Sequence, residues 1–417
     1  MKRLHLGRFA LGYGLASALL AGCTADANGT SPIGLSAVRT RSGSAYRVVY
    51  DFGSYPTDGE IPEAGLINLN GVLYGTTING GSGCYSSGGC GTVFALTTSG
   101  TETLLHSFNG AADGALPYAD LTSINGTLYG TTAGGASTSG TVYSVTTSGK
   151  ESVLHRFQGI PDGSDPQAAL VDVSGTLYGT TTFGGAQQNR GTVFQITTSG
   201  QEKLLYRFVF KTQGGRRDGK YPESRLLNVN GTLYGTTYEG GEGNRGTIFK
   251  ITPSGSESVL HSFKGTKTDG AYPRAGLLYV NGTIYGTTSG GGNGLCEGCG
   301  NHEHFGTVFE ITPSGKEKLI YKFKGYPNDG AVPGELTYDN GTFYGTTVSG
   351  GANCAVSHGC GTIFSIMPSG SERMLYSFLP REGAEPVSGL VDIGGTLYGT
   401  TPDGGTYDEG TVYAFSP

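Results

Sequence analysis

The sequence predicts an all-β protein, a seven-bladed β-propeller with four antiparallel strands per blade that is closed by N-terminal strand pairing with the last blade. Three observations support this fold class. Three sequence markers each recur seven times, short strand-like segments alternate with tight-turn signals, and the two ends of the repeated region lack complementary strands. No sustained helical periodicity follows residue 22.

The composition fits this class and excludes others. Glycine accounts for 76 of 417 residues, yet no Gly-X-Y period is present, which excludes collagen. Aromatic residues make up 10% of the chain, which argues against disorder. The net charge is −6 and only 14% of residues are charged. A chain with so few cations is a poor candidate for binding nucleic acid or an anionic membrane surface.

Residues 1–22 have the features of a secretory signal. Lys2, Arg3 and Arg8 precede an apolar run, 9–20, that is shorter than the ~20 residues needed to span a bilayer. The run ends in Leu-Ala-Gly-Cys23, which resembles the lipobox of bacterial lipoproteins, and this resemblance implies lipidation of Cys23. The alternative is ordinary cleavage near this point, with Cys23 incidental.

The same resemblance implies a location. In lipoproteins of this kind an Asp after the lipidated Cys signals inner-membrane retention, so Thr24 predicts the outer membrane, with the chain periplasmic or surface-exposed. Small and polar residues dominate 23–45 and predict a flexible tether. Residues 46–417 are then expected to form one propeller domain.

Each marker is found once per predicted blade. The tetrapeptide Tyr-Gly-Thr-Thr begins at Tyr74, Tyr129, Tyr178, Tyr234, Tyr285, Tyr344 and Tyr398. The pattern Gly-Thr-Val/Ile-Phe/Tyr begins at Gly91, Gly140, Gly191, Gly246, Gly306, Gly361 and Gly410. A strand-like segment ends at Phe52, Phe108, Phe157, Phe208, Phe263, Phe323 and Phe378.

The first complete unit shows how a blade is built. Its strands are expected at about 64–70, 72–77, 91–98 and 101–108. Asn70-Gly71 predicts a two-residue hairpin turn between the first two, because both central positions of a type I′ turn need positive φ. Ser99-Gly100 predicts a tight turn between the last two.

The ends of the repeat predict how the ring closes. A lone fourth strand, 46–52, precedes the first unit, and the last unit has no fourth strand after 410–415. Pairing these two segments would complete a seventh blade and remove most free sheet edges. An open solenoid is the alternative, but it predicts no such complementary truncation.

The repeat resembles the bacterial GloVer tandem-repeat family over about residues 46–417. The shared pattern is Asp-Gly-Ala-x-Pro, then Asn-Gly-Thr-Leu-Tyr-Gly-Thr-Thr, then Gly-Thr-Val-Phe-x-Ile-Thr-Pro-Ser-Gly-x-Glu. The resemblance implies an extracellular protein and no shared enzymatic activity.

The connections between the second and third strands differ in length and contain the remaining cysteines. They are long in blades 1, 5 and 6, so the sector of blades 5-6-7-1 is the predicted site. The cysteines form three local pairs, which predict disulfides in an exported chain: Cys84 with Cys90, Cys296 with Cys299, and Cys354 with Cys360. For blade 5 a zinc site made by Cys296, Cys299, His302 and His304 is the alternative.

Two repeated polar positions are interpreted as scaffold. One holds Asp58, Asp113, Asp162, Asp218, Asp269, Asp329 and Glu382, where an Asp can bond its own loop; a ring of calcium or sugar sites is the alternative. The other holds His106, His155 and His261, with Tyr50, Tyr206, Tyr321 and Tyr376 in the remaining blades. That position needs a large flat ring and does not need a base.

Polar residues on the first strands are the candidates for lining a central funnel. They are Asp120, Asp172, Arg225, Glu335, Tyr338 and Asp392. A solvated channel without a ligand is the alternative. A local basic segment made by Lys211, Arg216, Arg217 and Lys220 could meet an acidic glycan, although a solvated loop explains it as well.

These features favour a non-catalytic binding scaffold with a polysaccharide or an envelope protein as its ligand. The alternative is a carbohydrate-active enzyme, a lyase or glycosidase, with Asp120 and Glu335 or Asp172 and Asp392 as its carboxylates. A structural envelope component without a ligand is a third possibility. No cofactor and no resident metal are expected, and we expect a monomer that meets the membrane only through its lipid.

Overall fold

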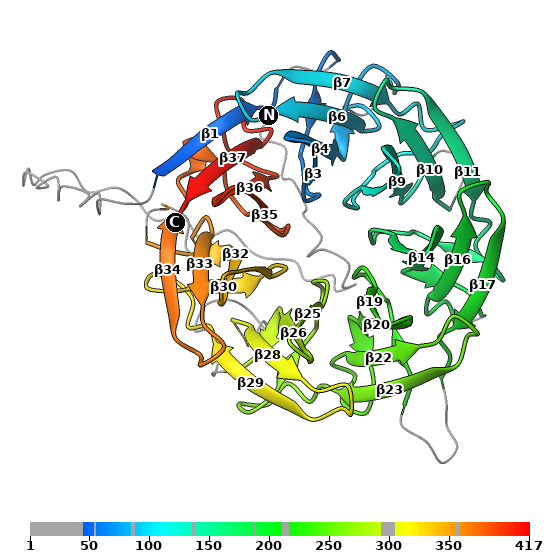
Figure 1. Cartoon of the computed structure of the whole chain (residues 1–417), viewed down its shortest axis with the longest axis vertical. Helices are drawn as coiled ribbons and strands as arrows, with labels where there is room; N and C mark the ends of the chain where they lie inside the picture. The colour runs from blue at the N-terminus through cyan, green and yellow to red at the C-terminus, as the bar shows by residue number, and fades with distance from the viewer. Residues whose placement is uncertain are drawn as a thin grey trace, which may run out of the picture. The chain divides into compact units, whose positions relative to one another are not determined.

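The computed structural model describes residues 45–53, 56–84, 88–135, 139–186, 188–210, 217–292, 305–352, 354 and 359–417. These residues form a ring of seven blades around a central axis (Figure 1), as the sequence predicts. Within each blade the first strand lies nearest the centre and the fourth forms the rim. No helix among the described residues is long and apolar enough to cross a membrane.

Each blade is a four-stranded antiparallel sheet. The first three consist of β3 (Ile67–Leu69), β4 (Val72–Thr77), β6 (Thr92–Thr97) and β7 (Glu102–Ser107); β8 (Thr122–Ile124), β9 (Thr127–Thr132), β10 (Thr141–Thr146) and β11 (Glu151–Arg156); and β13 (Val171–Val173), β14 (Thr176–Thr181), β16 (Thr192–Thr197) and β17 (Glu202–Arg207).

Blades 4 to 7 repeat the arrangement. They consist of β19 (Leu227–Val229), β20 (Thr232–Thr237), β22 (Thr247–Ile251) and β23 (Glu257–Ser262); β25 (Leu278–Val280), β26 (Thr283–Thr288), β28 (Thr307–Ile311) and β29 (Glu317–Lys322); β31 (Thr337–Asp339), β32 (Thr342–Gly350), β33 (Thr362–Ile366) and β34 (Glu372–Ser377); and β35 (Val391–Ile393), β36 (Thr396–Thr401), β37 (Thr411–Ser416) and β1 (Ala45–Asp51).

The N-terminal strand closes the ring. β1 pairs antiparallel with β37, from Ala45 opposite Ser416 to Asp51 opposite Thr411, and supplies the rim strand of blade 7 (Figure 1). Tyr46 of β1 stacks on Tyr376 of blade 6, with ring centroids 4.3 Å apart. The strand therefore joins blade 7 and packs on its neighbour, as the truncated ends predict.

Short ribbons between the blades are an element that the sequence analysis does not predict. Two-residue strands pair in β2 (Gly59–Glu60) with β5 (Asn79–Gly80), β12 (Gly163–Ser164) with β15 (Phe183–Gly184), β18 (Gly219–Lys220) with β21 (Glu239–Gly240), and β24 (Gly270–Ala271) with β27 (Gly290–Gly291). In blade 6, β30 (Gly330–Pro333) pairs with the end of β32, and a 3-10 turn, η1 (Pro380–Glu382), precedes blade 7. The ribbons cap the side of the ring that carries the longer connections, which we call the loop face.

The repeated motifs are explained by packing between and within blades. The seven repeated Phe residues are fully buried or nearly so, and each meets the third-strand aromatic ring of the next blade, for example Phe52 with Phe94 at 5.2 Å. The ring of Phe94 lies so close to Gly75 that a Cβ there would be 2.6 Å from it. The hydroxyl of Thr76 donates to Pro117 O of the next blade (3.0 Å), and Thr77 bonds Thr92 within the blade (2.7 Å).

Two details differ from the expected strands and turns. The first strands are only three residues long, as in β3, whereas the sequence analysis expected one over about 64–70 in blade 1. The turn between the third and fourth strands is longer than two residues: Thr97 N donates to Thr101 O, and the intervening Gly100 has φ +96°. The Asn70-Gly71 turn has positive φ at both positions, as predicted.

Candidate functional site

A cavity of about 570 Å³ lies where the first strands surround the axis. Four of the six predicted funnel residues line it: Asp120, Arg225, Glu335 and Tyr338. Tyr279 lines it as well. Asp172 and Asp392 are not among its lining residues. Each instead accepts a 2.8 Å hydrogen bond from a hairpin glycine, Gly175 N and Gly395 N, and so holds the turn after its strand.

An ion pair crosses blade 5 inside this cavity. Arg225 of blade 4 donates to Glu335 of blade 6, with Nε 2.8 Å from Oε1 and a second contact through Nη2. The attraction of Glu335 outweighs the desolvation of the guanidinium and raises the pKa of Arg225. Gly276 lies between the two side chains, and a Cβ there would be 2.6 Å from Glu335 Oε2. Gly276 is therefore required for this pair.

Asp120 has a structural partner too. Its Oδ1 accepts the backbone N–H of Gly65 from blade 1 at 2.5 Å. The predicted charged residues that line the cavity, Asp120, Arg225 and Glu335, thus bond across blade boundaries. Only the fold brings them together, because they lie on different repeats.

A second group of side chains lies on the loop face of blades 3 to 5. We define the aromatic–basic patch as Arg190, Tyr221, Tyr238, Arg245, Tyr272 and Arg274, all partly exposed. The Arg274 guanidinium lies 4.2 Å from the Tyr238 ring centroid, and that of Arg245 lies 5.2 Å from Tyr272. The Tyr238 and Tyr272 rings are 5.1 Å apart. The patch is therefore continuous across the boundary between blades 4 and 5.

A repeated backbone bond positions the patch. The residue before each repeated Pro has φ near +60° and donates its N–H to the carbonyl oxygen two residues before the third strand of the previous blade. Tyr221 N bonds Arg190 O in this way (2.9 Å), and Tyr272 N bonds Arg245 O (2.7 Å). The scaffold is common to the ring, whereas the Tyr and Arg side chains on it are confined to these blades; the corresponding residues elsewhere include Ile61, Leu116 and Val332.

Cations outnumber carboxylates around the patch. Lys220 lies over Tyr221, with Nζ 4.9 Å from the ring centroid, and pairs with Glu239 at 2.5 Å. Arg274 lies 3.7 Å from Glu223. Arg217 stands over the exposed Phe210 ring at 5.9 Å. Of the predicted basic segment, Arg217 and Lys220 thus border the patch, while Lys211 and Arg216 lie outside the described residues.

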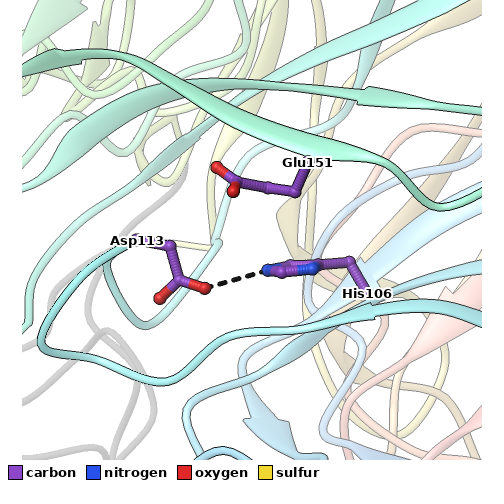
Figure 2. A group of neighbouring side chains, drawn as sticks. All are labelled: His106, Asp113 and Glu151. Atoms are coloured by element: carbon purple, nitrogen blue, oxygen red, sulfur yellow. Dashed lines mark hydrogen bonds and ion pairs between the residues drawn. The ribbon is translucent and has the colours of Figure 1, made fainter.

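A third group lies at the seams between blades. At six of the seven seams the His or Tyr of one fourth strand bonds the repeated Asp of the following connection, and a Glu from the next fourth strand lies beside them. At the seventh seam Tyr376 bonds Glu382. Figure 2 shows His106, Asp113 and Glu151, with His106 Nε2 3.0 Å from Asp113 Oδ2. His155 with Asp162 and His261 with Asp269 are each 3.2 Å apart. At the last seam, Tyr46 of β1 replaces the Glu.

The repeated Asp residues hold their own loops, as the scaffold interpretation expects. Asp58, for example, accepts the N–H of Gly59 at 2.7 Å and that of Gly53 at 3.2 Å. Where the ring is Tyr, its hydroxyl donates to the Asp, at 2.8 Å for both Tyr206 with Asp218 and Tyr321 with Asp329. Burial raises the pKa of Glu102 and Glu372, beside two of these tyrosines, to about 7.

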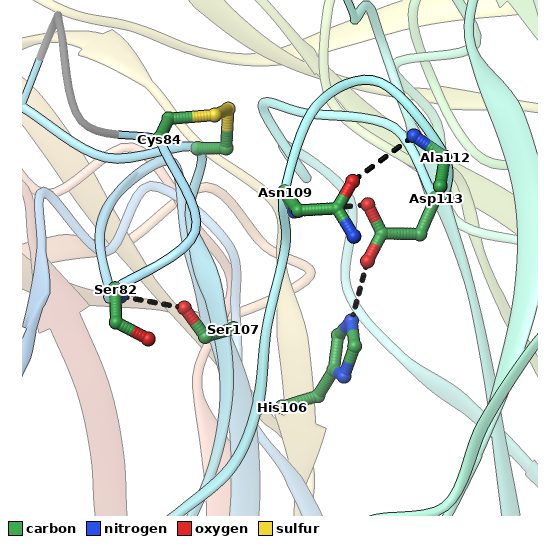
Figure 3. The surroundings of a disulfide bond; sticks show 8 residues. Ser82, Cys84, His106, Ser107, Asn109, Ala112 and Asp113 are labelled. Carbon is green, nitrogen blue, oxygen red and sulfur yellow. Dashed lines mark hydrogen bonds and ion pairs between the residues drawn. A yellow bond between two sulfur atoms is a disulfide. The ribbon is translucent and has the colours of Figure 1, made fainter.

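Two of the three predicted disulfides are present. Cys84 bonds Cys90 and Cys354 bonds Cys360, each with Cα atoms 5.5 Å apart. The first lies beside the connection that carries Asp113 (Figure 3), where a Cβ on Gly110 would be 2.9 Å from Cys90 Sγ. Cys296, Cys299, His302 and His304 lie outside the described residues, as does Cys23.

The sequence analysis missed the patch, although a signal was present. Tyr221, Tyr238 and Tyr272 depart from the small, aliphatic or acidic residues at the same repeat positions. The prediction relied on loop lengths, and it therefore placed the site in the sector of blades 5-6-7-1. The patch shares only blade 5 with that sector.

Comparison with solved structures finds distant matches. A gluconolactonase from Xanthomonas campestris is 14% identical, with a TM-score of 0.40 over 70% of this chain and 82% of that one. A quinohemoprotein alcohol dehydrogenase from Pseudomonas putida is 9% identical, with a TM-score of 0.47 over 89% and 76%. A Trypanosoma rangeli sialidase is 9% identical, with a TM-score of 0.42 over 89% and 59%. At these scores and identities the enzymes carry no argument about activity.

No curated protein matches the sequence. The Gloeobacter/Verrucomicrobia repeat matches residues 84–301 and 294–417, which together span most of the propeller. With its tandem repeats folded into a closed ring, the chain belongs to the Gloeobacter/Verrucomicrobia repeat family.

Proposed function

We propose that the protein is a lipid-anchored, exported propeller that binds an acidic polysaccharide at the bacterial cell envelope without altering it chemically. The aromatic–basic patch carries the proposal. Tyrosine rings offer apolar faces with a polar tip, which suits a sugar ring. Arginine guanidinium groups match carboxylates in paired hydrogen bonds, which suits a uronic acid.

The position of the patch supports binding in preference to a packing role. The backbone bonds that link adjacent blades recur around the ring with side chains as different as Ile61 and Asp165, so the linkage itself requires no Tyr or Arg. The excess of cations is local, in a chain whose net charge is −6. An acidic chain that concentrates cations on one loop face favours an anionic ligand there.

The funnel gives less support to the alternative, a carbohydrate-active enzyme. Hydrolysis of a glycoside needs one carboxyl group that delivers a proton and a second that acts as base or nucleophile. Glu335 is already held by Arg225, and Asp120 by Gly65 N–H. Both carboxylates therefore have structural partners in the arrangement that the fold presents.

Anchoring rests on the sequence of residues 20–23. Lipidation of Cys23 would hold the propeller at the membrane through the tether 23–45. Replacing the residue, Cys23→Ser, should move the protein from the membrane fraction to the soluble fraction. Retention of this variant in the membrane would contradict the lipid anchor and leave the binding proposal intact.

Binding is tested with the purified chain against polygalacturonate, alginate and the neutral polymer dextran. We expect binding to the two acidic polymers and none to dextran, with affinity that falls as salt rises. The double variant Arg245→Gln, Arg274→Gln should bind at least about tenfold more weakly, because a hydrogen bond to a charged group contributes roughly 1.5–3 kcal/mol. Arg373→Gln is the matched control, since Arg373 is exposed on the rim strand β34.

Three outcomes would overturn the proposal. The first is binding of dextran as tight as that of the acidic polymers, or equal binding of the acidic polymers by the double variant and the control. The second is release of shorter oligosaccharides from a bound polymer, which would establish an enzyme. The third is absence of polysaccharide binding together with a specific envelope protein partner.

A further inference from the structure

The seven seams can be compared with one another, because the same strand position holds a His at three seams and a Tyr at four. The acidic residue that it bonds is Asp at six seams and Glu382 at the seventh. The three histidine seams are His106–Asp113–Glu151, His155–Asp162–Glu202 and His261–Asp269–Glu317. Each takes its His from the fourth strand of one blade, its Asp from the connection that follows, and its Glu from the fourth strand of the next blade. A ligand bound by the His, Asp and Glu of one seam would therefore join two blades.

A phenol can satisfy both carboxyl groups at one atom. Its O–H donates one hydrogen bond to a carboxylate, while its oxygen accepts another from a second carboxyl group in the protonated form. Tyr206 accordingly bonds both Asp218 and Glu257, and Tyr321 bonds both Asp329 and Glu372. At these two seams the phenol therefore joins both carboxyl groups directly.

An imidazole nitrogen cannot do the same. When Nε2 donates its proton to the Asp, it has no lone pair left for the Glu. At each histidine seam Oε1 of the glutamate, in Glu151, Glu202 and Glu317, is buried and has no hydrogen-bond partner among the described residues. Oε1 of Glu257 and of Glu372, at two tyrosine seams, likewise has no hydrogen-bond partner among those residues, but each of these carboxyl groups still bonds the phenol. The exchange of Tyr for His thus removes the hydrogen bond that the phenol makes to the glutamate at those two seams.

We propose that each histidine seam binds one divalent transition-metal ion, Zn²⁺ being the expected one. One imidazole nitrogen and two carboxylate oxygens, all within 4.8 Å of one another, supply three ligands of the types that zinc accepts. A zinc ion needs its nitrogen and oxygen ligands at roughly 2.0–2.2 Å, so a small inward movement of the side chains completes the set. The two carboxylates balance the charge of the ion.

The surroundings suit such a site. Backbone N–H groups orient the Asp at each seam, for instance Asn109 N to Asp113 Oδ1 at 2.9 Å and Lys264 N to Asp269 Oδ2 at 2.8 Å, as second-layer contacts do for metal ligands. The histidine side chains are 18–21% exposed, which gives an ion a path from solvent and leaves room for a water as fourth ligand. Zinc would then connect blades 1 with 2, 2 with 3, and 4 with 5.

The test is zinc titration of the chelator-treated, tag-free full chain, followed by native mass spectrometry and calorimetry. We expect three ions per chain at micromolar zinc, one for each seam, and a rise in thermal stability that EDTA reverses. Each of His106→Tyr, His155→Tyr and His261→Tyr should remove one ion, and the triple variant should remove all three. These variants should fold, because Tyr occupies the same position at Tyr50, Tyr206, Tyr321 and Tyr376.

A gain-of-site variant completes the design. Tyr206→His should add one ion, because Asp218 and Glu257 already stand beside that position. Zinc that persists in the triple His→Tyr variant is bound elsewhere, for example by the blade 5 cysteines and histidines, and is subtracted from the number of ions assigned to the seams. Equal zinc binding by the parent and the triple variant, or zinc binding by the parent only at millimolar concentration, would overturn the proposal. Because no seam residue belongs to the aromatic–basic patch, failure here leaves the polysaccharide proposal standing.

Discussion

At the scale of single residues, the positions that break the repeat carry the information about function, and the positions that keep it carry the fold. The Tyr-Gly-Thr-Thr motif is explained residue by residue by contacts with the neighbouring strand and blade, as for Gly75, Thr76 and Thr77. Arg225 and Glu335 obey no repeat pattern, and they meet in the cavity. Tyr221 and Tyr272 depart from the pattern in the same way.

One seam residue predicts how stability depends on pH. Burial, followed by the charge of Asp329, raises the pKa of Glu372 from 4.5 to about 7. The fold therefore favours the protonated carboxyl, and the contribution of Glu372 to stability is lost as the pH rises from the ordinary carboxyl range through about 7. Glu372→Gln imitates the protonated form and should remove this loss.

The measurement is urea unfolding of both proteins in the presence of a chelator. The variant should match the parent at about pH 4 and exceed it in unfolding free energy at about pH 8. Glu242→Gln, at an exposed position, is the control and should leave the pH dependence unchanged. A Glu372→Gln variant that is less stable than the parent at about pH 8 would show that the carboxylate form is the one the fold prefers.

At the scale of strands and connections, the sequence was sufficient for most features that depend on local chemistry. Asn-Gly turns, strand-like segments and cysteine spacing predicted the blades, the hairpins and two disulfides, because each depends on residues close together in the chain. The short ribbons, such as β2 with β5, were not predicted, since two-residue strands rich in glycine leave no periodic pattern.

The candidate sites could be predicted only in part, and the reason is the ring itself. Asp120, Arg225, Glu335 and Tyr338 were expected to face the axis, and they line the cavity. That Arg225 pairs with Glu335 across Gly276 depends on the relative rotation of blades 4, 5 and 6, which local sequence does not encode. Asp172 and Asp392 shared the polar character but serve their own turns.

At the scale of the whole molecule, closure makes every seam possible. The seam groups and the aromatic pairs each join two successive blades, and the aromatic–basic patch spans blades 3 to 5. Each therefore depends on how neighbouring blades pack. The last seam depends directly on β1, since Tyr46 supplies the contact that a glutamate supplies at the other seams. A ring left open between β1 and β37 would lose this seam and expose a strand edge.

The most direct test of this account is a disulfide placed across the closure. Ala45 and Ser416 are opposite each other in the β1–β37 register. The double variant Ala45→Cys, Ser416→Cys should form an intrachain disulfide, detected by peptide mapping, whereas Ala45→Cys with Ser258→Cys, an exposed serine on blade 4, should not. The account predicts a monomeric, cross-linked chain of raised thermal stability. Free thiols at both positions under oxidising conditions, or cross-links found only between two chains, would contradict a ring closed by its own ends.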